Sequence, residues 1–228
     1  MKKAVVISLG GSLIVPEKMD AEFLEGFKHL LRRYYDTHRF VIVCGGGTIA
    51  RKYISVLKLD HKPQKQLSMA GIRATRMNAQ FMMQFFGKEA NDKLPLDMED
   101  VKDNLRKNYI VICGALRFAE NSTSDTTAAK LAHFFNTDFV NVTNVNGLYT
   151  KDPREHKDAR LIRKISWKEF ENKALKIRHT PGQHFVLDQN AAVLIKKHKI
   201  PTFIIGNSLA NLEKVLRNRK FEGTIIKG

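Results

Sequence analysis

The fold is decided by Ala4-Val5-Val6-Ile7-Ser8-Leu9-Gly10-Gly11-Ser12, a short apolar run that stops at two glycines. Apolar residues in unbroken succession favour a strand that is buried on both faces, and the glycines predict a tight turn at its end. The pattern returns at Phe40-Val41-Ile42-Val43-Cys44-Gly45-Gly46-Gly47. Two such units, each followed by a helical pattern, indicate a mostly parallel sheet whose strands are connected by helices.

The same alternation continues along the rest of the chain. Apolar runs predict four more strands, at residues 109–113, 139–142, 202–205 and 224–226. Helical spacing predicts helices at residues 21–36, 49–57, 75–86, 125–135, 188–198 and 209–217. The predicted fold class is therefore α/β, with helices on both faces of the sheet. With 228 residues the chain suits one domain or two closely joined lobes.

Composition narrows the classes of function. Lys and Arg number 39 against 23 Asp and Glu, and the net charge of +16 favours polyanionic partners, either nucleic acid or a phosphorylated small molecule. The cysteines, Cys44 and Cys113, each end an apolar run, which indicates a reducing compartment and excludes a cysteine-rich zinc site. No apolar stretch reaches the length of about 18 residues that a membrane helix needs, so we expect a cytoplasmic protein without a membrane partner.

The glycine-rich turns at the ends of the first two strands are candidate anion sites. In an open parallel sheet, ligands bind beyond the carboxyl ends of the strands, where glycine lets backbone N–H groups approach a phosphate closely. Either turn alone is also explained by the shape of a strand-to-helix connection. Neither turn matches the Walker motif or the dinucleotide fingerprint G-x-G-x-x-G, which argues against a P-loop kinase and a dehydrogenase.

Three further polar features admit both a functional and a structural interpretation. Arg51 follows the triple glycine and could reach a phosphate, or it could be an ordinary surface arginine. Residues 121–127 could bind phosphate or a base through their hydroxyls, with Asp125 aligning the reacting groups, or they could cap a helix. In residues 144–153 Tyr149 could stack on a base and Asp152 could bind a ribose, although a plain turn explains the Asn-Gly and Asp-Pro pairs equally well.

Taken in order, these motifs resemble the amino acid kinase superfamily and, within it, the archaeal-type uridylate (UMP) kinases. The resemblance runs nearly from end to end and rests on six stretches: 8–16, 45–54, 71–79, 143–153, 187–192 and 223–226. It implies a three-layer αβα sandwich, an N-terminal acceptor-binding lobe over about residues 1–135 and a C-terminal ATP-binding lobe over about 136–228. It further implies transfer of the γ-phosphoryl group of ATP to UMP in pyrimidine nucleotide biosynthesis, with Mg²⁺, and a homo-oligomer, commonly a hexamer.

The resemblance also assigns individual residues. The catalytic groups it implies are Asp125, Arg51 and Ser8. On the ATP side it implies Gly10, Gly11, Ser12, Gly47, Arg51, Thr143, Asn144, Tyr149 and Asp152. On the acceptor side it implies Gly45, Gly46, Ser68, Gly71, Thr75, Asn121, Ser122, Thr123 and Ser124. No side chain is expected to ligate a metal, because Mg²⁺ would be held mainly by ATP phosphates and water.

The chain departs from the family pattern at several positions. Ser8 stands where much of the superfamily has lysine, so the neutralisation of phosphoryl charge falls to Mg²⁺, Arg51 or helix dipoles. Ser68 stands where the family has an aspartate that binds the acceptor ribose, and Asn146 replaces an aspartate of the nucleotide loop. Residues 115–121 are longer than the family pattern and lack its proline-glycine.

Three hypotheses therefore remain at the level of sequence. The first is a UMP kinase or a related kinase with another small acceptor. The second is a nucleotide-binding sensor or regulatory subunit without catalysis, which the changes at Ser68 and Asn146 suggest. The third is a nucleic-acid-binding protein, suggested by the net charge and recognisable by binding that weakens steeply with salt. Because no basic tail or interleaved Arg/aromatic pattern is present, we do not expect specific nucleic-acid binding.

Overall fold

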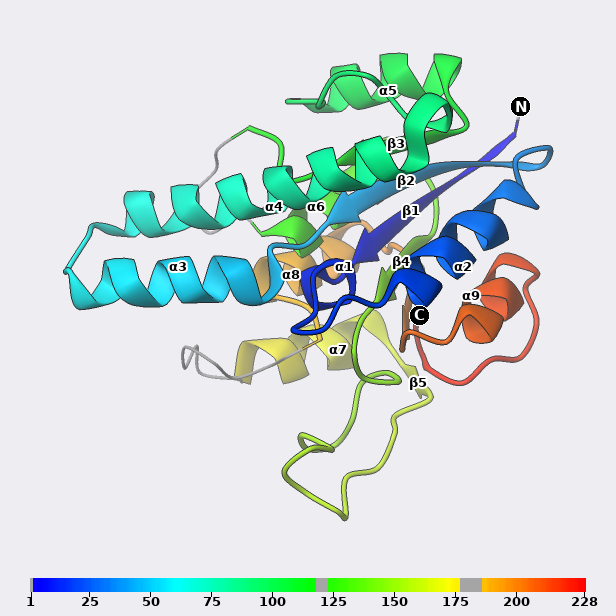
Figure 1. Ribbon diagram of the computed structural model, residues 1–228. Helices are drawn as coiled ribbons and strands as arrows, with labels where there is room; N and C mark the ends of the chain where they lie inside the picture. Colours follow the sequence, from blue (N-terminus) through cyan, green and yellow to red (C-terminus); the bar gives the residue numbers. More distant parts are fainter. Residues whose placement is uncertain (1, 118–122, 177–185) are drawn as a thin grey trace.

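The first apolar run forms β1 in the interior of a seven-stranded sheet, with a parallel strand on either side (Figure 1). The structure is a computed structural model that describes residues 2–117, 123–176 and 186–228. Its strands are β1 (Lys3–Leu9), β2 (His38–Cys44), β3 (Ile110–Cys113), β4 (Phe139–Val142), β5 (Lys164–Ile165), β6 (Thr202–Ile205) and β7 (Thr224–Ile226). Their order across the sheet is β3-β2-β1-β4-β6-β7-β5. All pairs are parallel except β6 with β7, so the prediction of a mostly parallel sheet is confirmed.

Helices cover both faces of this sheet. They are α1 (Gly11–Ile14), α2 (Ala21–Arg32), α3 (Gly47–Leu59), α4 (Gln64–Phe86), α5 (Met98–Lys107), α6 (Ser124–Phe134), α7 (Trp167–Lys176), α8 (Gln189–Lys197) and α9 (Leu209–Leu216), with a 3₁₀ turn, η1, at Gly87–Glu89. One core unites α2, α4 and α9 with one face of the sheet, and a second core unites α5, α6, α7 and α8 with the other face. The fold is therefore the three-layer αβα sandwich that the sequence predicts.

The register brings the carboxyl ends of three strands together. Leu9, the last residue of β1, is paired with Cys44 at the end of β2 and with Val142 at the end of β4. The chain turns from β1 and β2 to β3 on one side and then crosses to β4 on the other side of β1. Such a reversal of strand order opens a crevice at the carboxyl edge of the sheet, which is where α/β proteins bind ligands.

The strand order also bears on the predicted lobes. The strands β1, β2 and β3 occupy one half of the sheet, and β4, β5, β6 and β7 occupy the other. A division near residue 135 falls just before β4, although the assignment of one half to an acceptor and the other to ATP stays a prediction.

Several elements differ from those that periodicity predicts. Helix α4 begins at Gln64 rather than at residue 75. Periodicity misses its first two turns because most of their residues are polar and carry little apolar signal. Periodicity also misses α5 and α7, which are short and rich in charged residues, and it misses the two-residue strand β5. As a result Ser68, Gly71 and Thr75 all lie inside one long helix instead of at a helix start.

Two glycine substitutions test the close packing at the end of β1. A Cβ atom at Gly11 would lie 2.3 Å from the amide nitrogen of Gly47, so Gly11→Ala must displace backbone and should cost at least about 2 kcal/mol of stability. The matched control is Gly71→Ala inside α4, where the nearest atom would be 3.6 Å away, and alanine there should stabilise by up to about 1 kcal/mol. Denaturant unfolding of both variants checks the opposite signs, and equal stabilities would refute the packing of the two bends.

Candidate active site

The two glycine bends touch each other directly, backbone against backbone. A Cβ atom on Gly11 would lie 2.4 Å from the carbonyl oxygen of Gly45, and one on Gly47 would lie 2.4 Å from the carbonyl carbon of Gly11. Gly47 also has φ +60, which glycine adopts without strain. The contact aligns the starts of α1 and α3 at the carboxyl edge of the sheet, and the backbone amide of Ser12 lies at the same junction. No residue with a side chain would permit so close an approach.

Backbone hydrogen bonds fix the bends to the strand ends. The Gly10 amide donates to the Val142 carbonyl at 2.9 Å, and the Gly45 amide donates to the Leu9 carbonyl at 2.9 Å. A Cβ on Gly10 would also lie 3.8 Å from Cα of Thr143. The bends are thus rigidly attached to β1, β2 and β4, and the first of them adjoins the loop that begins at Thr143.

Asp125 lies at the start of α6 and contacts the end of β1. The Ser8 hydroxyl donates a hydrogen bond of 2.8 Å to the Asp125 carboxylate, although 117 residues separate them in sequence. Ser8 is 1% exposed, whereas Asp125 is half-buried. The hydroxyl of Thr123 caps α6 by accepting from the amides of Asp125 and Thr126, and Ser124 is the first residue of that helix. The structure thus brings Ser8 on β1 to the start of α6, where Thr123, Ser124 and Asp125 lie.

The environment of Asp125 favours its protonated form. Burial, first, and the charge of Asp188, second, raise the pKa of Asp125 from 3.8 to about 7, while the hydrogen bond from Ser8 acts in the opposite direction. A carboxyl group whose pKa burial and a neighbouring charge raise to near neutrality is typical of functional sites. This pKa describes the protein without ligands.

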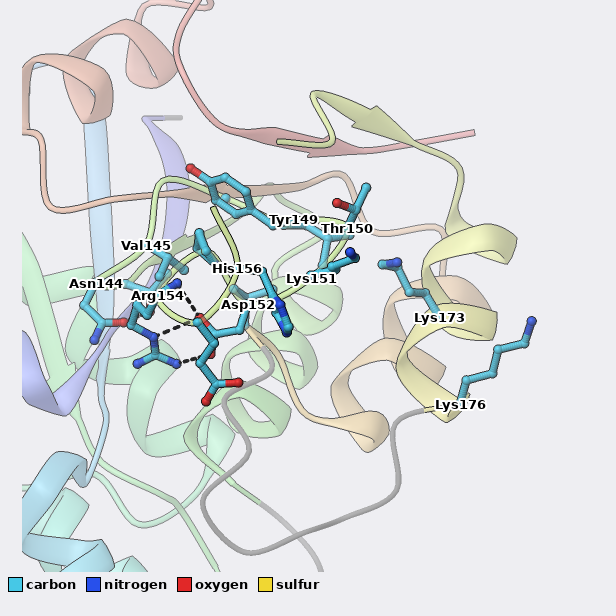
Figure 2. A pocket seen from close by; sticks show the side chains of 16 residues that line it. Asn144, Val145, Tyr149, Thr150, Lys151, Asp152, Arg154, His156, Lys173 and Lys176 are labelled. Atoms are coloured by element: carbon cyan, nitrogen blue, oxygen red, sulfur yellow. Dashed lines mark hydrogen bonds and ion pairs between the residues drawn. The ribbon is translucent and has the colours of Figure 1, made fainter. Parts of the chain in front are cut away.

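A cavity of about 640 Å³ is lined mainly by the loop that follows β4 (Figure 2), and the first residue of this loop, Thr143, adjoins Gly10. Of the nine residues expected on the ATP side, the structure brings Thr143, Asn144, Tyr149 and Asp152 into its wall. Gly10 adjoins this wall through Thr143, whereas Arg51 lies on α3. The cavity has the size and mixed polarity that a nucleotide requires.

Positive charge dominates the rim of the cavity. Lys151, Arg154, Lys173 and Lys176 line it together with the acidic residues Asp152 and Glu155. In Figure 2, Lys173 extends from α7 toward the loop, whereas Lys176 points away from it. Asp152 forms an ion pair with Arg154 in which the guanidinium donates at 3.0 and 2.6 Å. A ribose that binds Asp152 would therefore compete with Arg154.

The acceptor-side residues are only partly gathered. A Cβ on Gly46 would lie 3.5 Å from the Thr75 side chain, and the Thr75 hydroxyl accepts from the Ala115 amide, so α4, β2 and the loop after β3 meet there. Ser68 lies two helical turns before Thr75, about 10 Å along α4, with Gly71 between them packed against Ile54. Asn121 and Ser122 lie outside the described residues. Ser68 is therefore not brought next to Gly46.

Arg51 is exposed on α3, one turn beyond Gly47. Its guanidinium donates a hydrogen bond of 2.9 Å to the Thr48 hydroxyl. The position and exposure of the side chain leave it able to turn toward an anion at the glycine bends.

Some residues of the site were not assigned by sequence reasoning. Asp188 accepts a hydrogen bond from Thr126 and acts on Asp125 through its charge. Asn141 donates to the carbonyl of Val186 in the cavity wall, and Lys173 lines the cavity from α7. The sequence could have identified Asp188 as an N-cap, since an aspartate just before an apolar helix is typical of that position. Lys173 carried none, because α7 itself was not predicted and a lysine on a charged helix is not distinctive.

Two negative findings limit the site. Within residues 2–117, 123–176 and 186–228, no three His, Cys, Asp or Glu side chains are grouped so that they could hold a metal ion. In the same part of the chain, no helix is both long enough and apolar enough to cross a membrane.

Comparison with known proteins places this geometry in one family. The amino acid kinase family profile matches residues 3–206. A uridylate kinase of Pyrococcus abyssi is 33% identical over 225 residues, covering 98% of this chain and 99% of that protein. One from Methanocaldococcus jannaschii is 33% identical over 230 residues, with 98% and 99% covered. The crystal structure of uridylate kinase from Archaeoglobus fulgidus superposes with a TM-score of 0.84, at 30% identity, with 99% of this chain and 100% of that chain covered. The chain belongs to the amino acid kinase family.

Proposed function

We propose that the chain is a UMP kinase, which transfers the γ-phosphoryl group of ATP to UMP and releases UDP and ADP. The observation that carries the proposal is the direct contact of the two glycine bends beside a nucleotide-sized cavity, with Asp125 at the end of β1. Relatives that share about a third of the residues over nearly the whole length are uridylate kinases, which supports UMP as the acceptor. From the same resemblance we expect a cytoplasmic homo-oligomer, with a hexamer as the expected form.

The backbone of the bends supplies most of the binding to phosphate. Glycine amides at the starts of α1 and α3 present N–H donors without side chains in the way, and helix N-termini favour anions. The base and ribose of ATP would occupy the cavity under residues 143–156, so its phosphate tail would run past Thr143 to Gly10 and Gly47. UMP would approach from the side of Gly46 and Thr75.

The chemistry then needs positioning and charge stabilisation rather than a covalent intermediate. An oxygen of the UMP phosphate attacks the γ-phosphorus in line. The new P–O bond forms as the bond to the oxygen bridging the β- and γ-phosphorus atoms breaks, and ADP leaves with those electrons. Arg51 stabilises the charge that spreads over the transferring group, and Asp125 orients the groups around it.

Mg²⁺ fits the site as a companion of ATP rather than as a resident of the protein. The described residues contain no cluster of three potential ligands, and Mg²⁺ keeps several waters and binds readily to substrate phosphates. When bound, it would supply part of the positive charge that Ser8, unlike a lysine, does not.

A coupled assay of ADP release tests the function directly. With MgATP we expect UMP to be the best acceptor, and the panel should include CMP, other nucleoside monophosphates and acidic amino acids. A different best acceptor would correct the substrate while keeping the kinase. Tight nucleotide binding without transfer to any acceptor would instead identify a regulatory protein.

Substitution of Arg51 should separate catalysis from stability. Arg51→Ala should lower kcat/KM by about 10²–10³ fold, because it removes charge from the transferring group, as the loss of comparable electrostatic groups does. The melting temperature should barely change, since the side chain is exposed and donates only to Thr48 among the described residues. Lys52→Ala, which removes the same charge from the next exposed position of α3, is the control and should stay within about threefold of wild type. Equal effects of the two would exclude Arg51 from the mechanism.

Substitution of Asp125 should trade activity for stability. Because folding raises the pKa of Asp125 from 3.8 to about 7, the folded state holds a proton that the unfolded state releases between these values, so stability falls as pH rises through this window. Asn cannot titrate, and Asp125→Asn should therefore raise the melting temperature of the ligand-free protein by about 2 °C or more at about pH 8, with a smaller gain at about pH 4. Turnover should fall by at least about 10² fold. A melting temperature that drops equally at both pH values would contradict this account of Asp125.

A further inference from the structure

Residues 186–188 connect the cavity to the place where the phosphoryl group would be transferred. Val186 lines the cavity, and its carbonyl accepts a hydrogen bond of 2.6 Å from the buried side chain of Asn141 on β4. Leu187 is fully buried in the core between the sheet and α6 to α8. Asp188 then begins α8. The segment is therefore fixed on one side by the sheet and on the other by two helices.

The Asp188 carboxylate joins the first turns of two helices. It caps α8 by accepting from the Ala191 amide at 2.9 Å. It also accepts from the hydroxyl of Thr126 at 3.0 and 3.1 Å and from the hydroxyl of Thr123, the residue that caps α6. One carboxylate thus holds α6, which carries Asp125, in register with α8, which follows the cavity wall.

Asp188 also acts on Asp125 through its charge. Two carboxylates in one region disfavour each other's ionised forms. The carboxylate of Asp125 accepts a hydrogen bond from Ser8 on β1, and the backbone amide of Asp125 donates to the hydroxyl of Thr123 at the start of the same helix. Among the described residues, Asp188 at the N-terminus of α8 is the charged group that raises the pKa of Asp125. The two helix N-termini favour the negative charges and make the arrangement tolerable.

We propose that Asp188 is a positioning residue for phosphoryl transfer, which fixes the place of Asp125 through Thr123 and Thr126 and holds a second negative charge beside it. This proposal rests on the proposed kinase function. It assigns Asp188 no contact with either substrate, and it makes the start of α8 the element that links the ATP cavity to Asp125.

The competing explanation is that Asp188 only caps α8, and Asp188→Asn separates the two. Asparagine caps helices as well as aspartate, so this variant should fold, and Asp188→Ser offers a second capping residue if it does not. What Asn removes is the charge and part of the hydrogen bonding to the two threonines. A pure cap would therefore show wild-type kinetics.

With UMP and MgATP we expect Asp188→Asn to lower kcat by about tenfold and both KM values by less than about threefold, since positioning acts on the transition state. The acid-side midpoint of kcat/KM, which reports the free enzyme, should move down by about half a pH unit or more. Ionisation of the substrates is common to both proteins and cancels in the difference. Thr126→Val is the matched control, because it removes one hydrogen bond but keeps the charge, and its midpoint should not move down.

The melting temperature of the ligand-free protein gives a readout that needs no activity. Relative to Asp125→Asn, which lacks this titration, wild type should lose melting temperature as pH rises from about 4 to about 7, and in Asp188→Asn the relative loss should start at the same pH, end at a lower pH and be smaller. Unchanged kcat or an unmoved pH profile would overturn the proposal. If the wild-type chain forms no UDP, the kinase assignment fails, and the melting profile alone decides whether Asp188 controls the charge of Asp125.

Discussion

The structure depends on a contact between two pieces of bare backbone. Gly11 and Gly45 approach so closely that neither could carry a Cβ atom, and this approach is possible only because β1 and β2 end at the same level of the sheet. The bends are consequently not two separate phosphate turns but one surface of amide groups shared by α1 and α3. The contact requires all three features together: the parallel register of β1 and β2, glycine at the bends, and the starts of α1 and α3 at the same edge of the sheet.

Two carboxylates lie near this surface, although carboxylates repel the anionic phosphates that a nucleotide kinase must bind. Asp125 and Asp188 lie together at the heads of α6 and α8, and the first is held partly protonated near neutrality. Positive groups stand further out, with Arg51 on one side and Lys173 at the rim of the cavity on the other. On the proposed function, the outer positive charges would attract the anionic substrates, while Asp125, positioned by Asp188, would orient the reacting groups.

The sequence predicted the mostly parallel sheet, most of its helices and the glycine bends at the ends of the first two strands, because long apolar runs and glycine-rich turns are local signals. It missed the helices α5 and α7, whose exposed faces carry mostly charge and whose apolar signal is short. The assignment of Ser68 to the acceptor side stays a prediction, and the structure places Ser68 two turns before Thr75 on the long helix α4. The partnership of Asp188 with Thr126 spans 62 residues and no local pattern could reveal it.

Serine at position 8 affects the charge of the site, because its hydroxyl is uncharged and contacts Asp125. A lysine there would bring a positive charge near Asp125, and a nearby positive charge favours the ionised form of a carboxylate. The Ser8 hydroxyl donates a hydrogen bond but no charge, so burial and Asp188 prevail and raise the pKa of Asp125 to about 7. On the proposed function, the positive charge that a lysine would offer to the phosphoryl group would come instead from the exposed Arg51 and from Mg²⁺ bound with ATP. Substrate binding, rather than the empty fold, would thereby complete the electrostatics of this site.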